Sequence, residues 1–280
     1  VAVDNHRQDD FAPYAWRTHD GGKSWQPINA GLPRDHFLAV VRADPVKRGL
    51  LYAGTDAGVY VSLDDGEHWQ ALQLNLPQAW VRDLLVHGND LVAATQGRAL
   101  WVLDDVSPLR TLAEAGDRTQ LFAPATAYRV HPNNNHDTPL PAETAVGMNP
   151  PAGAVIDYTL AADAAGPITL EIHDARGALV RRFASDDNPV AARAHRYVAA
   201  DWLKPLPVLA ATPGAHRFVW DLRYPQPRAI SYEYGIGAVY GVNTPTLPAG
   251  AYVVPGRFEV VLKVGTQQWR QPLTVKADPR

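Results

Sequence analysis

The chain has 280 residues, of which 46% are hydrophobic, with a formal net charge of −3 and no cysteine. This composition predicts one or two globular cores and excludes a disordered tail, a disulfide framework and a thiolate metal site. The weak charge offers no footprint for nucleic acid or an acidic membrane surface, and no apolar run approaches the ~18 residues that span a bilayer. We therefore expect neither a nucleic-acid nor a membrane partner.

An eight-residue motif of the pattern Ser/Thr-x-Asp-x-Gly-x-Thr/Ser-Trp occurs twice in the N-terminal part. It runs from Thr18 to Trp25 and again from Ser62 to Trp69, where His68 replaces the usual hydroxyl residue. The glycines allow a positive φ in a tight turn, the carboxylate and hydroxyl bond the turn backbone, and the tryptophan packs between strands or sheets. This motif is an Asp box, and we expect structural roles for its residues in both copies: Asp20, Gly22, Trp25, Asp64, Gly66 and Trp69.

Short strands with a repeat near 44 residues surround the two boxes, since Asp20 and Asp64 lie 64 − 20 = 44 positions apart. Strand candidates cover residues 1–3, 38–42, 52–55, 58–62, 80–86, 92–95 and 99–104. The third copy of the repeat lacks the box. Residues 1–106 are therefore predicted to form about two and a half blades of a β-propeller. A closed array needs further blades, either from the intact chain or from a second copy.

Residues 107–150 are rich in Pro and Asn and are predicted to connect two domains. His131, His136 and Asp137 fall in this connector, and their spacing favours a solvated loop over a metal site. We predict no metal and no cofactor.

Residues 151–280 return to a period of two and are predicted to form an antiparallel β-sandwich of immunoglobulin or fibronectin type. Six strands are expected at 155–160, 168–172, 179–183, 216–222, 257–264 and 269–275, with turns at 174–177 and 265–266. Trp220 is expected in the core. The segment 225–248, with Tyr232, Tyr234 and Tyr240, has no strand period, and its aromatic rings are interpreted as packing groups, with sugar stacking as the alternative.

Several segments together resemble bacterial BNR/Asp-box repeat proteins, which are often labelled sialidase-like or glycosyl hydrolase. Besides the boxes, these segments are Gly97–Leu109 and Arg217–Pro225, while Leu170–Gly177 and Pro248–Tyr252 are similar to an immunoglobulin-like module of FlgD type. The resemblance implies an exported protein, periplasmic or secreted, with propeller blades first and a β-sandwich last. It implies that this chain corresponds to the C-terminal portion of such a protein. Asp boxes occur on proteins of many functions, so the resemblance does not fix the chemistry.

Blade topology indicates where a functional site would lie. The box turns join third and fourth strands at one end, so the other loops and the blade connectors share the opposite face. That face is predicted to carry the catalytic candidates Asp9, Asp10, Asp35 and Asp56 and the ligand-binding candidates His6, Arg34, His36, Trp80 and Arg98. Carboxylates, imidazole and guanidinium groups suit acid/base work and bidentate contacts with a glycan or acidic ligand. The alternative is a solvated polar rim.

Three functions follow from this reading. The favoured one is a binding or interaction scaffold for a carbohydrate or protein ligand, without a complete catalytic centre in these residues. The chain lacks the Arg-Ile-Pro motif of sialidases, so the second is part of a sialidase-like or xyloglucanase-like glycoside hydrolase completed by further blades. The third is an assembly protein in which two chains pair their open blades.

Overall fold

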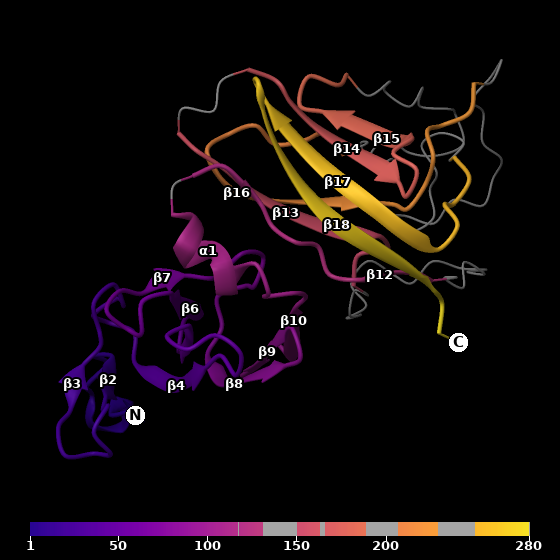
Figure 1. Ribbon diagram of the computed structural model, residues 1–280. Coiled ribbons are helices and arrows are strands. Elements are labelled where there is room, and N and C mark those ends of the chain that lie inside the picture. Colours follow the sequence, from indigo (N-terminus) through magenta and orange to yellow (C-terminus); the bar gives the residue numbers. More distant parts are fainter. Residues whose placement is uncertain (117, 131–149, 163–165, 189–206, 229–249, 280) are drawn as a thin grey trace, which may run out of the picture. The chain divides into compact units, whose positions relative to one another are not determined.

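The computed structural model describes residues 1–116, 118–130, 150–162, 166–188, 207–228 and 250–279. The chain divides into two compact units, Val1–Gly116 and Asp117–Arg280 (Figure 1). Within the described ranges it is an all-β protein with several sheets, as predicted, and it carries one seven-residue α-helix and one short 3-10 helix. No helix in these ranges is long and apolar enough to cross a membrane.

The first unit contains three antiparallel sheets. Their strand orders are β1-β2-β3, β4-β5-β6-β7 and β10-β9-β8. The elements are β1 (Ala2–Val3), η1 (His6–Gln8), β2 (Tyr14–Arg17), β3 (Gln26–Pro27), β4 (Leu38–Ala43), β5 (Leu51–Thr55), β6 (Val59–Ser62), β7 (Gln70–Ala71), β8 (Val81–His87), β9 (Asp90–Thr95), β10 (Leu100–Leu103) and α1 (Leu109–Ala115).

The second sheet is a complete four-stranded antiparallel sheet, and each neighbouring sheet repeats three of its strands. Each strand of β4–β7 pairs with the next one along the chain. The first Asp box forms the turn between β2 and β3, and the second forms the turn between β6 and β7. Equivalent boxes therefore join equivalent strands, while the third sheet has three strands and no box.

The second unit contains two sheets, with strand orders β11-β13-β16 and β12-β18-β17-β14-β15. All pairings are antiparallel except that β12 runs parallel to β18. The strands are β11 (Gln120–Leu121), β12 (Ala127–Arg129), β13 (Ala154–Leu160), β14 (Ile168–Asp174), β15 (Leu179–Ala184), β16 (Gly214–Trp220), β17 (Gly256–Val264) and β18 (Gln267–Ala277).

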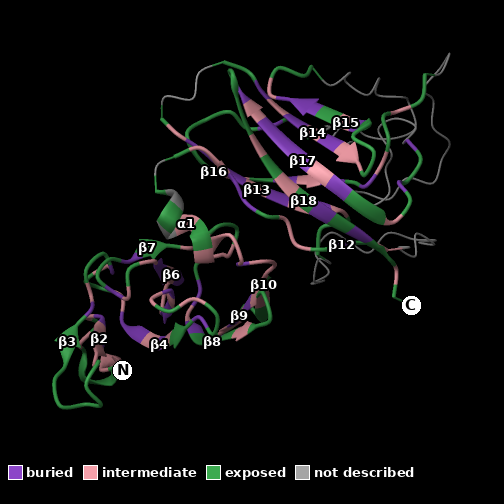
Figure 2. Cartoon of the chain, viewed as in Figure 1, coloured by how far each residue is buried: buried purple, intermediate pink, exposed green. Residues whose placement is uncertain are grey.

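Alternating side chains build the core of the second unit. In β14, Ile168, Leu170 and Ile172 are buried and their neighbours are partly exposed, as expected for a strand with one face on a core. One hydrophobic cluster includes residues from both sheets, and Figure 2 shows this burial along the strands. Trp220 of β16 is fully buried, as predicted, and its ring meets Phe258 of β17 in the other sheet at 5.6 Å.

All six strands predicted for this region are present, and so are both turns. The hairpin at 174–177 is closed by the Gly177 N–H, which donates to the Asp174 carbonyl at 2.9 Å. The predicted connector contains elements that we did not anticipate, namely α1, β11 and β12. The predicted loop residues His131, His136, Asp137, Tyr232, Tyr234 and Tyr240 lie outside the described residues.

Candidate binding face

The strand register of the first unit brings five loops to one end of its sheets. Val3 pairs with Tyr14, Leu38 with Thr55 and Val81 with Thr95. Five loops therefore lie at the strand ends opposite the Asp-box turns: the β1–β2 loop, the connectors that precede β4 and β8, the β5–β6 loop and the β9–β10 loop. We call this end the loop face. It contains every predicted catalytic and ligand-binding residue.

An aromatic cluster joins three of the loops. The His6 ring stacks on Phe37 with centroids 4.5 Å apart and meets the edge of Trp80 at 5.3 Å. Phe37 also contacts Trp80, at 5.1 Å, and Phe11 lies 6.2 Å from Phe37. Phe37 is almost fully buried, whereas Phe11 is 43% exposed. Packing of these rings fixes the β1–β2 loop against both connectors.

A cation lies over the Trp80 ring of this cluster. The Arg82 guanidinium lies 4.1 Å from the centroid of the Trp80 ring, a cation–π distance. Arg82 also donates to the Gln96 side chain at 3.4 Å. The Trp80 backbone carbonyl accepts from the Gln96 N–H at 2.8 Å, while its indole nitrogen is buried and has no hydrogen-bond partner among the residues that the structure describes. The cluster therefore presents the Arg82 guanidinium at the loop face, while the Trp80 indole nitrogen lies beneath the surface.

His36 and Asp56 form a pair beside the cluster. The imidazole Nδ1 lies 3.1 Å from the Asp56 carboxylate, and both side chains are about one quarter exposed. Burial raises the pKa of the nearby Tyr60 phenol, and the negative charges of Asp56 and Asp35 raise it further. A phenol in this environment resists ionisation, which is the opposite of what a phenolate nucleophile needs.

Asp10 holds the β1–β2 loop together. Its carboxylate accepts from the Asn5 side chain at 3.0 Å, the Ala12 N–H at 3.1 Å and the Tyr14 hydroxyl at 2.9 Å. These bonds, that from Asn5 foremost, lower the pKa of Asp10. His6 is held in a similar way, since its ring and backbone N–H both contact Asp4 at 2.5 and 3.1 Å.

The remaining candidates lie at the rim. Asp9 has a left-handed φ of 62° and follows η1. Arg34, Asp35 and Arg98 are exposed, and the Arg98 carbonyl accepts from the Trp101 indole at 2.8 Å. The contacts thus bring His6 to Trp80 and His36 to Asp56, and they place Asp35 and Asp56 near one phenol. In the described residues, no group of three or more His, Asp or Glu side chains is arranged to hold a metal ion.

The Asp-box aspartates are occupied by their own turns. Asp20 accepts from the Ser24 N–H at 2.9 Å, the Ser24 hydroxyl at 2.7 Å and the Thr18 hydroxyl at 2.8 Å. These bonds, led by that from the Ser24 hydroxyl, lower its pKa. In the second box the His68 imidazole takes the place of the hydroxyl and lies 2.7 Å from the Asp64 carboxylate. The substitution therefore preserves the turn.

Two residues of the loop face escaped the sequence reasoning. Phe37 precedes a strand and resembles an ordinary core residue, and Arg82 alternates outward within β8. Both adjoin candidates that were named, since Phe37 follows His36 and Arg82 lies two positions after Trp80. The available signal was that an aromatic residue and a cationic residue lie within two positions of named candidates.

The comparisons with known proteins assign this chain to no family. No family model and no curated protein matches the chain. Among solved structures, the chain is similar to one described as the extracellular domain of a hybrid two-component system from B. thetaiotaomicron. The identity is 8%, the match covers 99% of this chain and 31% of that chain, and the TM-score is 0.26. At that TM-score the likeness carries no argument.

Proposed function

We propose that this chain is a binding scaffold of an exported Asp-box repeat protein, periplasmic or secreted, and that the loop face is its ligand-binding surface. In this proposal the first unit supplies about two and a half propeller blades, and the second is an immunoglobulin-like sandwich. The ligand class is a carbohydrate or a protein surface.

The repeat relationship supports the propeller part of the proposal. The Ile28 N–H donates to the Ala15 carbonyl at 2.9 Å, and 44 residues later the Leu72 N–H donates to the Val59 carbonyl at 2.8 Å. Correspondence of single hydrogen bonds at the box period indicates one structural unit used repeatedly. For the second unit, support comes from two mainly antiparallel sheets that share one core.

The engagement of the loop-face carboxylates is the observation that carries the choice of binding over hydrolysis. Asp10 is bonded to three groups of its own loop, and Asp56 is paired with His36. Two carboxylates that flank a bond must instead be placed to exchange protons with substrate or water. Aromatic rings and a guanidinium beside these carboxylates suit recognition of a sugar or a polar protein surface.

The alternative is a share in a glycoside hydrolase whose active face is completed by further blades. The observation in its favour is that Asp35 and Asp56 both lie close enough to Tyr60 to raise its pKa. Two acidic groups near one phenol could serve a substrate that spans this face.

The test is binding of the whole chain to an immobilised glycan array, with release of reducing ends measured in parallel. Arg82→Ala removes the cation over Trp80 and is expected to reduce binding at least tenfold. Arg48→Ala is the matched control because this guanidinium is also exposed but lies on the β4–β5 loop, at the opposite end of the strands. Binding that is unaffected by Arg82→Ala contradicts the assignment of the face. Sugar release that is lost in Asp56→Asn would establish the hydrolase instead.

A further inference from the structure

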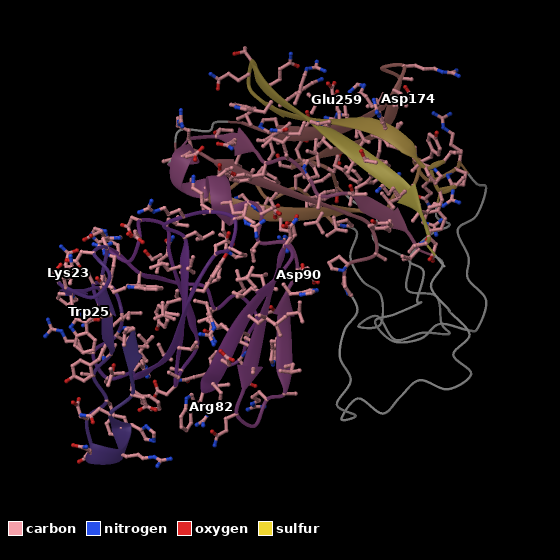
Figure 3. All side chains as sticks on the ribbon, turned by 60° about the horizontal axis from the view of Figure 1, so that its bottom comes forward. Lys23, Trp25, Arg82, Asp90, Asp174 and Glu259 are labelled. Carbon is pink, nitrogen blue, oxygen red and sulfur yellow. The ribbon has the colours of Figure 1, made fainter. Side chains whose placement is uncertain are left out.

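The two Asp boxes differ in what covers their tryptophans. Trp69 of the second box is 5% exposed, whereas Trp25 of the first box is 47% exposed. Figure 3 shows Trp25 beside Lys23 at the edge of the first unit. The Trp25 indole donates to the Gly22 carbonyl of its own turn at 3.2 Å. A large apolar group is therefore in water in one copy of a motif that buries it in the other.

Trp69 is buried by the sheet unit that precedes it. Its indole donates to the Ile28 carbonyl at 2.7 Å, and its backbone N–H donates to the Ala30 carbonyl at 2.8 Å. Gly31 permits this approach, because a Cβ there would lie 2.2 Å from the Trp69 carbonyl oxygen. Gly66 of the box lies against the Ile28 side chain in the same way. The segment Ile28–Gly31 is thus a receptor for the second box.

Charge adds a second element of recognition. Arg17 of the preceding unit donates to the Asp65 carbonyl at 2.5 Å and to the Glu67 carboxylate of the second box. Forty-four positions earlier, the first box has Lys23 in place of Glu67, and Lys23 is exposed. A partner that docks on the first box in the same way therefore needs an acidic side chain at the position that Arg17 has in the β1–β2–β3 sheet.

The chain contains one later equivalent of the receptor segment, and its sequence differs from that of Ile28–Gly31. Leu72–Asn75 occupies the place of Ile28–Gly31, one repeat later, and no box tryptophan covers it. Leu74 is 69% exposed, and a cavity of about 50 Å³ remains beside it. Asn75 stands where Gly31 has its left-handed φ of 92°, but in this segment the left-handed φ falls on Leu74, at 44°, so the backbone has a different shape. A second copy of this chain is therefore a poor occupant of the first box.

We propose that the first Asp box, Thr18–Trp25, is a docking surface for a further sheet unit of the same 44-residue repeat. After its last strand, that unit has a four-residue segment equivalent to Ile28–Gly31: an apolar residue, any residue, a small residue and glycine. It also has an acidic residue at the position equivalent to Arg17. It accepts the Trp25 indole hydrogen bond on a backbone carbonyl and pairs with Lys23. The inference rests on the proposed repeat array but not on ligand binding by the loop face, so a blank glycan array leaves it intact.

The test measures hydroxyl-radical oxidation of Trp25 by mass spectrometry, with Trp69 as the internal reference. A copy of residues 36–89 is placed before Val1 of the whole chain, which supplies one complete unit and a first strand beside β1. The copy carries Leu74→Ala and Asn75→Gly, which restore the receptor sequence, and Val61→Glu, which faces Lys23. The matched control copy also carries Leu74→Ala, but it retains Asn75 and has Val61→Lys in place of Val61→Glu. In parallel, the unaltered chain is titrated with a peptide of residues 26–33.

Docking lowers the oxidation rate of Trp25 toward that of Trp69. The exposed fractions of 47% and 5% set a ceiling of 47/5, or about ninefold, and a fall of about threefold or more is expected in the extended chain but not in its control. Protection by the peptide alone supports the same conclusion. An unchanged Trp25 rate in both the extended and the peptide-titrated chains overturns the proposal. So does protection of the unaltered chain that rises with its own concentration and accompanies dimers in sedimentation, because the occupant is then a second copy.

Discussion

Replacing each box tryptophan by alanine tests whether burial between units, rather than the turn itself, makes the motif stabilising. A tryptophan side chain presents roughly 200 Å². Trp69 and Trp25 differ in exposed fraction by 47% − 5% = 42%, which corresponds to about 80 Å² and, at about 25 cal/mol per Å², to about 2 kcal/mol. We expect Trp69→Ala to cost about 3–5 kcal/mol, including the cavity it leaves, and Trp25→Ala about 1–2 kcal/mol.

The assay is urea unfolding followed by far-UV circular dichroism, because the substitutions remove fluorescent residues. The two compact units are expected to give separable transitions, and the shift is assigned to the first unit because Trp25 and Trp69 both lie in it. Unchanged slopes show that the unfolded state is comparable. Equal losses of stability in the two variants, or a larger loss for Trp25→Ala, would refute the reasoning, since the turn alone would then supply the effect.

Three further predictions concern other contacts. Arg110→Met is expected to destabilise the first unit by about 3–5 kcal/mol, because it leaves the fully buried Asp44 carboxylate without its cation 3.1 Å away; Lys47→Met, which breaks the exposed pair with Glu114, is expected to cost at most about 1 kcal/mol, and equal costs in urea unfolding would contradict this. Gly31→Ala is expected to destabilise more than Gly88→Ala, since both have positive φ but a Cβ at Gly88 meets nothing within 4 Å; thermal unfolding ranks them, and the reverse order would count against the receptor segment. Lys263→Met is expected to raise the pKa of Glu171 in an NMR titration. Burial raises this pKa, but hydrogen bonds from Lys263 and His173 hold it below its usual value. These bonds therefore stabilise the second unit at pH values above the usual carboxyl pKa, and the stabilisation is lost as the pH falls through the lowered pKa of Glu171. An unchanged titration in Lys263→Met, matched to Lys276→Met as control, would remove that explanation.

Strands with one buried face were predictable because period two survives in the sequence. β14 and β17 keep apolar residues at alternate positions, and their turns carry Asp-Ala-Arg-Gly and Gly-Thr. The two-residue strands β3 and β7 are exposed throughout and are too short to show a period, so pairing with a neighbour defines them. Helix α1 was missed for another reason: an Arg110 contact with Asp44, 66 residues away, anchors it, and no local pattern encodes such a partner.

The candidate site was predictable as a set of loops but not as a set of contacts. Blade topology brought His36 and Asp56 to one end from separate loops, and they are paired. It could not indicate that Asp10 bonds within its own loop, because that depends on the conformation of residues 5–14. Nor could it indicate that Arg82 lies over Trp80, since a strand residue pointing outward has no sequence signature for the ring it covers.

The Arg17 contact favours one order of the sheets within the first unit. Arg17 requires the carboxylate and carbonyl of the second box, whereas Val61, its counterpart one repeat later, is buried in an apolar cluster. Successive junctions thus differ in chemistry: the first adds an ion pair to its apolar contacts, and the second is apolar at the equivalent position. A sheet paired out of order would place the Arg17 guanidinium against an apolar surface or leave Glu67 without its cation. The different contacts at successive junctions therefore disfavour non-native pairing between sheets of similar structure.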